Sequence, residues 1–349
     1  MVSFDSISAR NREVLKAVIS DYIFTAEPVS SGAIAGKYLK DLSSATVRNV
    51  MAELEEMGFL FQPHTSAGRV PTDKAFRVYV DQLMELKSLR RQEREEIKRA
   101  CSSPGHEVSD LIKDVSRILS TISHHTGLAI VPRITETVLK HIEFVKLRGN
   151  QARVVLISQA GIVQNRLIEF LEEGSKQADL DRMSSYLNQL FSGLTIKEIK
   201  IRLIKEMRNE RNLYDRLLKK ALRLGEEVLG RADSEAKEVF IEGGSRFFEY
   251  PEFLDVERMK EIFRAFEEKS RIVQLLDMSL KAEGIHIFIG CETGSSEFDG
   301  CSLIAASYGI EGNISGSLGV IGPIRMDYSR IIPLVGYTAK LVEKMLKEG

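Results

Sequence analysis

The sequence of 349 residues contains little cysteine, with only Cys101, Cys291 and Cys301. None of the three belongs to a CxxC pair or lies in a pattern typical of metal ligands. A secreted domain held by disulfides is therefore not expected, nor is a zinc site built from cysteines. Reduced thiols are typical of a cytoplasmic protein.

Segments that enter or cross a membrane are also missing. No stretch reaches the roughly 18 apolar residues that a membrane-spanning helix needs. The first residues, MVSFDSISARNREVL, lack both the basic region and the apolar region of a secretion signal. We therefore expect a cytoplasmic protein with no membrane partner.

The sequence has no excess of basic residues. Its formal net charge is -1, whereas DNA-binding proteins are often basic. Any binding to nucleic acid must then depend on a local basic patch. The residues expected to form that patch are Arg48, Arg69, Lys74 and Arg77.

The segment from Pro28 to Pro71 has the order of a winged helix-turn-helix: a short helix, a turn, a second helix and a β-hairpin. The second helix should begin at Ser43 or Ser44, because a serine hydroxyl can accept a hydrogen bond from a free amide of the first turn. Apolar residues recur along it every three or four positions and should pack against the preceding helix. They are Val47, Val50, Met51, Leu54 and Met57.

The opposite face of this second helix carries the candidate DNA-reading residues. In a helix-turn-helix the first turns of this helix enter the major groove, where arginine can bind guanine and asparagine can bind adenine. We expect Arg48 and Asn49 to read bases, and Ser44 and Thr46 to support contacts to bases or phosphates. The second half of the helix carries three glutamates and should point away from the phosphates.

A hairpin, the wing, should follow the helix. Gly58 is expected to end the helix, turn residues lie between 64 and 68, and Pro71 ends the return strand. The tip of the wing should place Arg69, together with His64, near phosphates or the minor groove. A helix, a glycine stop and a basic hairpin in this order predict DNA binding better than any one of these features.

Two long segments of the chain resemble one family. SSATVRNVMAELEEMGFLFQPHTSAGRVPTDKAFRVYV is similar to the N-terminal domain of the heat-inducible transcription repressors called HrcA. DGCSLIAASYGIEGNISGSLGVIGPIRMDYSRIIPLV resembles the C-terminal signature of that family. The resemblance implies a repressor of heat-shock (chaperone) operons that binds an inverted-repeat operator in double-stranded DNA as a homodimer and is released on heat stress. It also implies that the chaperonin GroEL supports this activity.

The rest of the chain predicts an α+β protein. A charged helical connector should follow the winged helix, and Ser102 to Gly105 marks a boundary. A helix and four strand-like runs come next, followed by long charged helices up to about Leu229, after which strands return. A sheet that is interrupted and then resumed predicts an insertion.

The resemblance implies a GAF-like domain with an inserted, mainly helical dimerisation domain. We expect a winged-helix domain with its connector over residues 1–103. The GAF-like domain should cover 104–170 and 249–349, and the inserted dimerisation domain 171–248.

No motif in the sequence assembles an enzyme active site. His106 and Glu107 begin like the zinc motif HExxH, but Asp110 stands in place of the second histidine. The glycines between 312 and 322 match neither GxxxxGK[ST] nor GxSxG. The adjacent pair His124 and His125 is expected to be structural or exposed. We expect no catalytic residue, no metal and no cofactor.

The run from Arg325 to Arg330 leaves two interpretations open. It can be a cap and ion pair where a strand meets a helix, with Asp327 or Ser329 as the N-cap. It can instead be an effector or partner site. This second interpretation corresponds to another function, a ligand-responsive transcription regulator that senses a small molecule through its GAF-like domain. A third function is an interaction scaffold whose winged helix contacts only protein.

Overall fold

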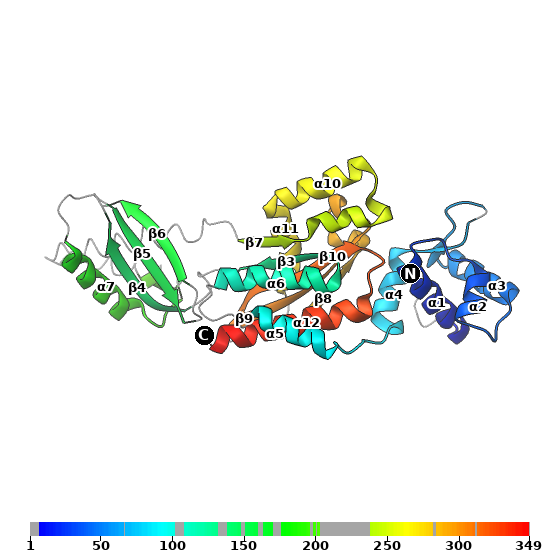
Figure 1. Cartoon of the computed structure of the whole chain (residues 1–349), viewed down its shortest axis with the longest axis horizontal. Coiled ribbons are helices and arrows are strands. Elements are labelled where there is room, and N and C mark those ends of the chain that lie inside the picture. The colour runs from blue at the N-terminus through cyan, green and yellow to red at the C-terminus, as the bar shows by residue number, and fades with distance from the viewer. Residues whose placement is uncertain are drawn as a thin grey trace.

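The computed structural model describes residues 7–65, 67–101, 108–131, 138–147, 151–159, 163–169, 176–195, 198–199, 201–202, 238–281, 284–310 and 313–348. These residues form three parts that follow one another along the molecule (Figure 1): an N-terminal domain, a central domain and a smaller inserted unit. The α+β fold class is confirmed. No helix among the residues above is both long enough and apolar enough to span a membrane.

The N-terminal domain is a winged helix-turn-helix, as predicted. Three helices pack around one core and a short hairpin follows: α1 (Ala9–Thr25), α2 (Ser31–Lys37), α3 (Ser44–Glu56), β1 (Leu60–Phe61) and β2 (Val70–Pro71). Each helix begins after a serine whose hydroxyl accepts a hydrogen bond from the amide three residues on. These serines are Ser8, Ser30 and Ser43.

Local chemistry also sets the end of α3 and the start of the next helix. Gly58 follows α3 with a φ of +76°, a left-handed conformation that favours glycine. Thr72 caps α4 (Asp73–Val78), which continues into a π-helical turn, η2 (Tyr79–Leu83). The predicted glycine stop is confirmed.

The central domain contains one antiparallel sheet of five strands in the order β7-β3-β10-β9-β8. The strands are β3 (Thr126–Ile130), β7 (Val239–Glu242), β8 (Ile285–Ile289), β9 (Cys301–Ile310) and β10 (Asn313–Pro323). Their side chains enter two separate cores, so both faces of the sheet are buried.

Helices cover the two faces of this sheet (Figure 1). On one side lie α5 (Arg91–Cys101), α6 (Val108–Ser123) and α12 (Tyr328–Glu348). On the other side lie α10 (Val256–Glu267) and α11 (Lys269–Asp277). Short 3-10 turns join these elements: η6 (Gly244–Glu249), η7 (Pro251–Phe253), η8 (Met278–Lys281), η9 (Gly290–Thr293) and η10 (Ser296–Phe298). This arrangement is GAF-like.

The charged segment after the winged helix differs from the solvated connector that we expected. Its helix α5 buries Glu93, Ile97 and Cys101. These residues are spaced by four and therefore lie on one face, which packs against α6 and α12. The Glu93 carboxylate is bound there by Arg330, at 2.6 Å. Since α5 is part of the central domain, we propose that the DNA-binding domain ends near η2 rather than at residue 103.

The inserted unit has its own antiparallel sheet, in the order β4-β5-β6. Its elements are β4 (Leu139–Lys146), β5 (Gln151–Ser158), β6 (Val163–Glu169) and α7 (Gln177–Phe191), and α7 packs against β4. The sequence analysis instead places these three strands in the GAF-like domain and predicts that the insertion begins at residue 171. Among the described strands they pair only with one another, while β3 pairs directly with β7.

This pairing supports other limits for the inserted unit than the predicted 171–248. Alternating apolar residues predicted strands, but such a pattern does not say which sheet a strand joins. We propose that the inserted unit runs from the end of β3 to the start of β7. Most of the long charged helices predicted up to Leu229, and the boundary at Ser102 to Gly105, lie outside the described residues.

Candidate nucleic-acid interface

The first two turns of α3 face away from the rest of the molecule. Ser44, Arg48 and Asn49 are exposed, while Val47 and Val50 on the other side of the helix are buried in the core. Neither Arg48 nor Asn49 makes a side-chain hydrogen bond or ion pair with any residue that the structure describes. Their polar groups are therefore available to an outside partner, and α3 lies at the end of the molecule far from the central domain (Figure 1).

Two serines and a threonine hold the start of α3. The Ser43 hydroxyl accepts from the Thr46 amide at 3.1 Å, so Ser43 is the N-cap and Ser44 is the first helical residue. The Thr46 hydroxyl lies 2.8 Å from that of Ser43 and is therefore engaged in the cap. The hydroxyls of Ser31 and Ser44 are 3.4 Å apart, which places the start of α2 beside the start of α3.

Two of the three glutamates in the second half of α3 are bound by other side chains of the domain, whereas Glu56 is exposed. Glu53 accepts a hydrogen bond of 3.1 Å from the Asn11 side chain in α1. Glu55 forms an ion pair of 2.7 Å with Arg69. These partners draw two carboxylates toward the domain, so the exposed polar groups of α3 that suit DNA gather at its N-terminal end.

The wing differs from the expectation at Arg69. The Arg69 amide donates to the Val29 carbonyl at 2.8 Å, and the Arg69 carbonyl accepts from the Val29 amide at 2.9 Å. Arg69 therefore lies at the base of the wing and not at its tip. Gly68 allows this close pairing, because a Cβ there would lie 2.3 Å from the Val29 oxygen. His64 and Thr65 remain exposed at the turn.

The predicted basic patch separates into residues with different environments. Lys74 donates to the Met57 carbonyl at 2.8 Å and lies 4.2 Å from the centre of the Phe59 ring. Arg77 is bound by Asp81, and also by Glu292 of the central domain at 3.2 Å. Of the four residues, only Arg48 is both exposed and without a partner among the described residues.

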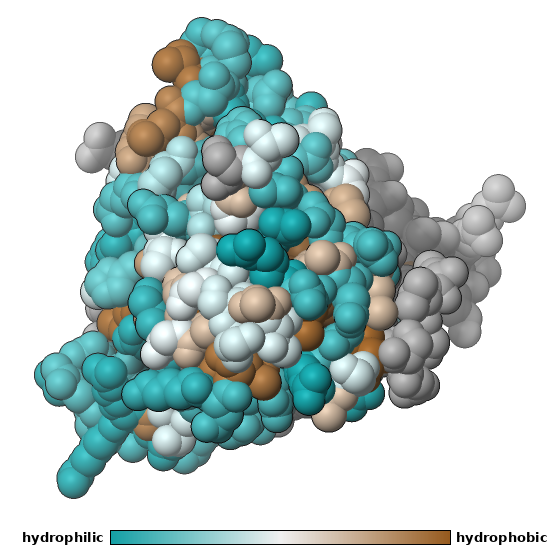
Figure 2. Space-filling model, turned by 90° about the vertical axis from the view of Figure 1, so that its right-hand side faces the viewer, coloured by the Kyte–Doolittle hydropathy of each residue, from teal (hydrophilic) through white to brown (hydrophobic). Residues whose placement is uncertain are grey.

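One basic residue was missed by the sequence analysis. Lys40 lies in the turn between α2 and α3, is exposed, and has no ion-pair partner within the described part of the chain. Its position three residues before the Ser43 cap is the signal that would have identified it, because this turn lies beside the start of α3. The end of the molecule that carries α3 is mostly hydrophilic or of intermediate hydropathy (Figure 2).

Of the two adjacent histidines, His124 is exposed and His125 is structural. His125 is buried, and its ring nitrogen Nδ1 lies against the Tyr250 hydroxyl. Burial, followed by the charges of Arg325, His124 and Arg246, lowers the pKa of His125 to about 3, so the ring is neutral at ordinary pH. No group of three possible metal ligands occurs among the residues that the structure describes.

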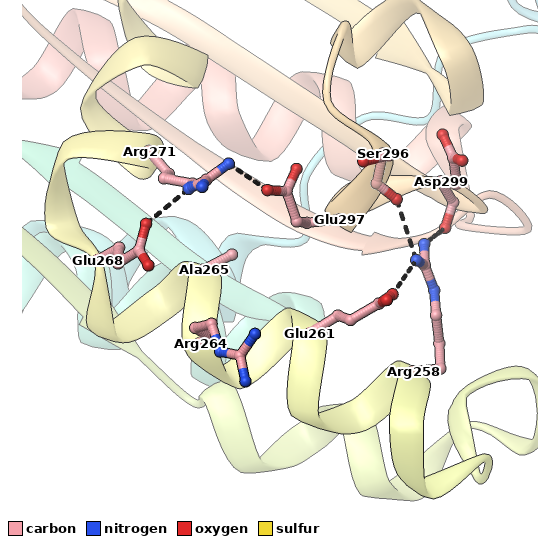
Figure 3. Close-up of a pocket in the computed structure, with 9 residues that line it drawn as sticks. All are labelled: Arg258, Glu261, Arg264, Ala265, Glu268, Arg271, Ser296, Glu297 and Asp299. Atoms are coloured by element: carbon pink, nitrogen blue, oxygen red, sulfur yellow. Dashed lines mark hydrogen bonds and ion pairs between the residues drawn. The ribbon is translucent and has the colours of Figure 1, made fainter.

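A charged pocket of about 410 Å³ lies between α10, α11 and η10 in the central domain (Figure 3). Arg258, Arg264 and Arg271 line it, and two of these three arginines are bound by its own carboxylates. Arg271 pairs with Glu268 at 2.7 Å and also with Glu297, and Arg258 pairs with Glu261 at 3.0 Å. Because these charges already neutralise one another, the pocket does not favour the ligand-sensing function.

The run from Arg325 to Arg330 forms the cap that one interpretation predicted. Asp327 is the N-cap of α12, since its carbonyl accepts from the Ile331 amide at 3.0 Å. The Ser329 hydroxyl donates to the Asp327 carboxylate at 2.5 Å. Arg325 is bound by Glu252, and Arg330 by Glu93 of α5.

Comparison with known proteins matches both the N-terminal and the C-terminal part of the chain to the same family. The family described as "Winged helix-turn-helix transcription repressor, HrcA DNA-binding" matches residues 6–85, and the family described as "HrcA protein C terminal domain" matches residues 109–332. The chain is 50% identical over 341 residues to the heat-inducible transcription repressor HrcA of Geobacter sulfurreducens, covering 98% of both chains. It is 45% identical over 343 residues to the protein of that name from Syntrophobacter fumaroxidans, again covering 98% of both.

A solved structure supports the fold. A crystal structure described as that of a hypothetical protein aligns with a TM-score of 0.65, at 20% identity, over 98% of this chain and 99% of that chain. At this level of identity the likeness concerns the fold alone.

Proposed function

The chain belongs to the family of heat-inducible transcription repressors named HrcA, and we propose that it represses chaperone operons by binding an inverted-repeat operator as a homodimer. Membership of this family makes it a DNA-binding repressor of transcription and not an enzyme. The observation that carries the proposal is that Arg48 and Asn49, in the first two turns of α3, are exposed and have no partner among the described residues.

Each residue at this end of α3 has a role that fits its chemistry. The Arg48 guanidinium can donate two parallel hydrogen bonds to guanine O6 and N7, and the Asn49 amide can bind adenine N6 and N7. Ser44, one helical turn before Arg48, and Lys40, in the preceding turn, suit phosphate oxygens. Thr46 keeps the cap in place, and His64 reaches the backbone from the wing. With Arg69 paired to Glu55, its contribution to DNA binding is reduced.

The inserted unit offers a surface for the second copy. α7 covers only one face of its three-stranded sheet, and the other face carries apolar side chains. Val145 is 36% and Leu167 is 56% exposed, and the two lie on either side of Arg153 in the sheet. The half-buried Val155 and Ile157 lie on the same face, where Val155 pairs with the exposed polar residues Glu143 and Asn165. Exposed valine and leucine side chains on a sheet face that also carries charged residues suit a surface that a protein partner covers. We propose that two copies pair through it, which agrees with the dimerisation role that the resemblance implies.

A two-fold dimer explains an inverted-repeat operator. The same recognition helix then faces each half-site, in major-groove segments that are about 34–36 Å apart or a multiple of that distance. Occupation of the promoter by this dimer would block transcription, and heating would release it. We place this activity in the cytoplasm, where bacterial operators lie.

We further propose GroEL as a partner in folding. β3 pairs with β10, although most of the chain separates these strands in sequence. Such long-range pairing slows folding and leaves apolar surface exposed for longer. Chaperonin should therefore raise the yield of DNA-binding protein on refolding, and an unchanged yield would remove GroEL from the proposal.

Selection of bound sequences from random double-stranded DNA tests the repressor proposal. We expect the full chain to enrich an inverted repeat, and Arg48→Ala to lose enrichment at one or more symmetric positions. Recovery of no preferred sequence, or of a single unrepeated site, would contradict binding as a symmetric dimer.

Sedimentation velocity tests the dimer surface. Leu167→Lys places a charge on the open face of the inserted sheet, and we expect it to shift the protein toward monomer. Leu254→Lys is the matched control, because Leu254 is a similarly exposed leucine, at 65%, on the central domain. Equal dimer content in both variants would show that the dimer forms elsewhere.

A further inference from the structure

The DNA-binding domain is docked on the central domain through the side opposite the exposed face of α3 (Figure 1). Two groups of contacts form this junction. The first joins α4 to β8 and η9, and the second joins α1 and the segment after η2 to the run from Arg325 to Arg330. We refer to both groups together as the docking junction.

The first group consists of polar contacts from α4. The Arg77 guanidinium donates to the Ile287 carbonyl at 2.9 Å and pairs with Glu292 at 3.2 Å. The Asp73 carboxylate accepts from the Cys291 amide at 3.2 Å. Gly290 makes this approach possible, since its φ is +53° and a Cβ there would lie 2.0 Å from an Asp73 carboxylate oxygen.

The second group uses the run whose purpose the sequence left open. Arg325 donates to the Ile23 carbonyl, at the end of α1, at 3.2 Å. Lys87 donates its amide to the Ser329 carbonyl and pairs its ammonium with Asp327, both at 3.0 Å. The run that caps α12 therefore also contacts the DNA-binding domain and the segment after η2, through Arg325, Asp327 and Ser329.

One aromatic contact crosses the junction among these polar ones. The Phe76 ring of α4 lies between Tyr22 of α1, at 6.4 Å, and Tyr328 of α12, at 6.2 Å between ring centres. The Tyr328 hydroxyl is held by Ser302 at 2.7 Å, which fixes the ring against Phe76. The other cross-domain contacts named above are hydrogen bonds and ion pairs whose side chains are partly exposed.

A junction of this composition should open before the cores on either side unfold. Ion pairs that water can reach each contribute little to stability, and polar interfaces between domains permit relative motion. The interior on either side consists instead of closely packed apolar side chains. The buried Phe76 and Tyr328 link these interiors across the junction. Heating therefore acts first on the orientation of the DNA-binding domain.

The docked arrangement leaves the DNA-reading residues free, so it is compatible with operator binding. In a dimer, two docked domains hold their recognition helices at a fixed separation, and the second half-site is then bound at a high effective concentration. Two undocked domains lose that advantage, although each can still bind one half-site.

We propose that the docking junction is the heat-sensitive element of this repressor: docked, it keeps both recognition helices in register with the operator, and its opening on heating releases the DNA. This inference rests on the proposed function, because it needs a dimer on an inverted repeat. It assigns the run from Arg325 to Arg330 to a structural coupling between the domains.

Two glycine variants of the full chain provide a matched test. Gly290→Ala places a methyl group against Asp73, whereas Gly294→Ala imposes the same kind of backbone strain, at φ +68°, with no atom within 4 Å of the new Cβ. Fluorescence anisotropy during heating would give the temperature at which each releases an inverted-repeat operator. We expect Gly290→Ala to release it roughly 4 to 8 °C below Gly294→Ala, the shift expected for a modest loss of stability in a domain of under about 100 residues.

The same measurement on a single half-site separates undocking from damage to α3. We expect the two variants to bind one half-site with equal affinity at low temperature. Release of the full operator at the same temperature by both variants would overturn the inference, as would a loss of half-site binding confined to Gly290→Ala.

A cross-linked variant decides the question even if Gly290→Ala does not fold. Asp73→Cys faces the exposed Cys291, and oxidised glutathione can take two electrons and two protons from the two thiols to form a disulfide across the junction. The other two cysteines are buried, so wild-type protein treated in the same way is the control.

We expect oxidised Asp73→Cys to hold the operator to a higher temperature than the same protein after reduction. Equal release temperatures in fully cross-linked and reduced protein would overturn the inference. Loss of operator binding on cross-linking, or no cross-link in folded protein, would overturn it equally. If wild-type protein binds no inverted repeat at low temperature, the proposed function itself fails, which is a separate result.

Discussion

On the outer face of the DNA-binding domain Arg48 is exposed and has no partner among the described residues, whereas on the inner face Arg77 is bound by Asp81, by Glu292 and by the Ile287 carbonyl. Both arginines belonged to the same predicted basic patch. The difference shows that residue type and position in a helix do not distinguish an arginine that reads DNA from one that joins two domains. The distinction depends on whether a carboxylate of the protein already forms an ion pair with the guanidinium.

The inner face should matter most for stability. Phe76→Ala removes a fully buried ring from the centre of that face and should lower the free energy of unfolding by about 3 to 5 kcal/mol. Phe61→Ala is the control, because that ring on the wing is 46% exposed. Urea unfolding followed by circular dichroism measures both, and equal losses would break the comparison between the two faces.

The outer face should matter most for specificity. Arg48→Ala should weaken operator binding by about 1 to 3 kcal/mol and narrow the gap to random DNA, because a bidentate contact to guanine is lost. On a single half-site, where docking of the two domains gives no advantage, Arg77→Ala should leave the ratio of specific to random binding unchanged. Anisotropy titrations of both variants on these DNAs provide the measurement, and an unchanged ratio in Arg48→Ala would remove it as a base reader.

The adjacent residues Ser43 and Ser44 allow the contribution to stability to be separated from DNA contact within one turn of α3. Ser43→Ala should lower the stability of the DNA-binding domain by about 1 kcal/mol, because the cap of α3 is lost. Ser44→Ala should leave stability nearly unchanged, since Ser44 is the first helical residue rather than the cap. Thermal melting distinguishes them, and an equal effect of both changes would contradict the assignment of Ser43 as the cap.

The smallest effect is expected at Arg69, which lies between the two faces. A free arginine on a phosphate contributes about 0.9 to the slope of log affinity against log salt. Arg69 is already paired with Glu55, so Arg69→Ala should change that slope by clearly less. Glu55→Gln should steepen the slope by freeing Arg69. Titrations at several salt concentrations test this, and a full unit of change in Arg69→Ala would restore its predicted role at the phosphates.

Much of the N-terminal domain could be predicted because its signals are local. The serine caps, the Gly58 stop and the apolar stripe of α3 each depend on residues within a turn or two of one another. The exposure of Arg48 and Asn49 followed from that stripe. Arg69 could not be placed in this way, because its partners Val29 and Glu55 come from other elements.

The C-terminal part shows the same limit on a larger scale. The strands β4, β5 and β6 were predicted from their alternating residues, but their separation from the central sheet was not. The helix α5 was predicted as a helix, while its burial against α6 and α12 was not. In both cases the element follows from its own residues, and its partner follows from distant ones.

For this protein, the amino-acid sequence by itself determined the order of the elements, the caps, the face of α3 that is left outward and the family. Only the tertiary structure decided which charges are paired, that β4, β5 and β6 form a separate sheet, and which residues the run from Arg325 to Arg330 contacts. The physical reason is the range of the interactions. Caps and helical periodicity act over a few residues, whereas an ion pair such as Arg77 with Glu292 forms only after the whole chain has folded.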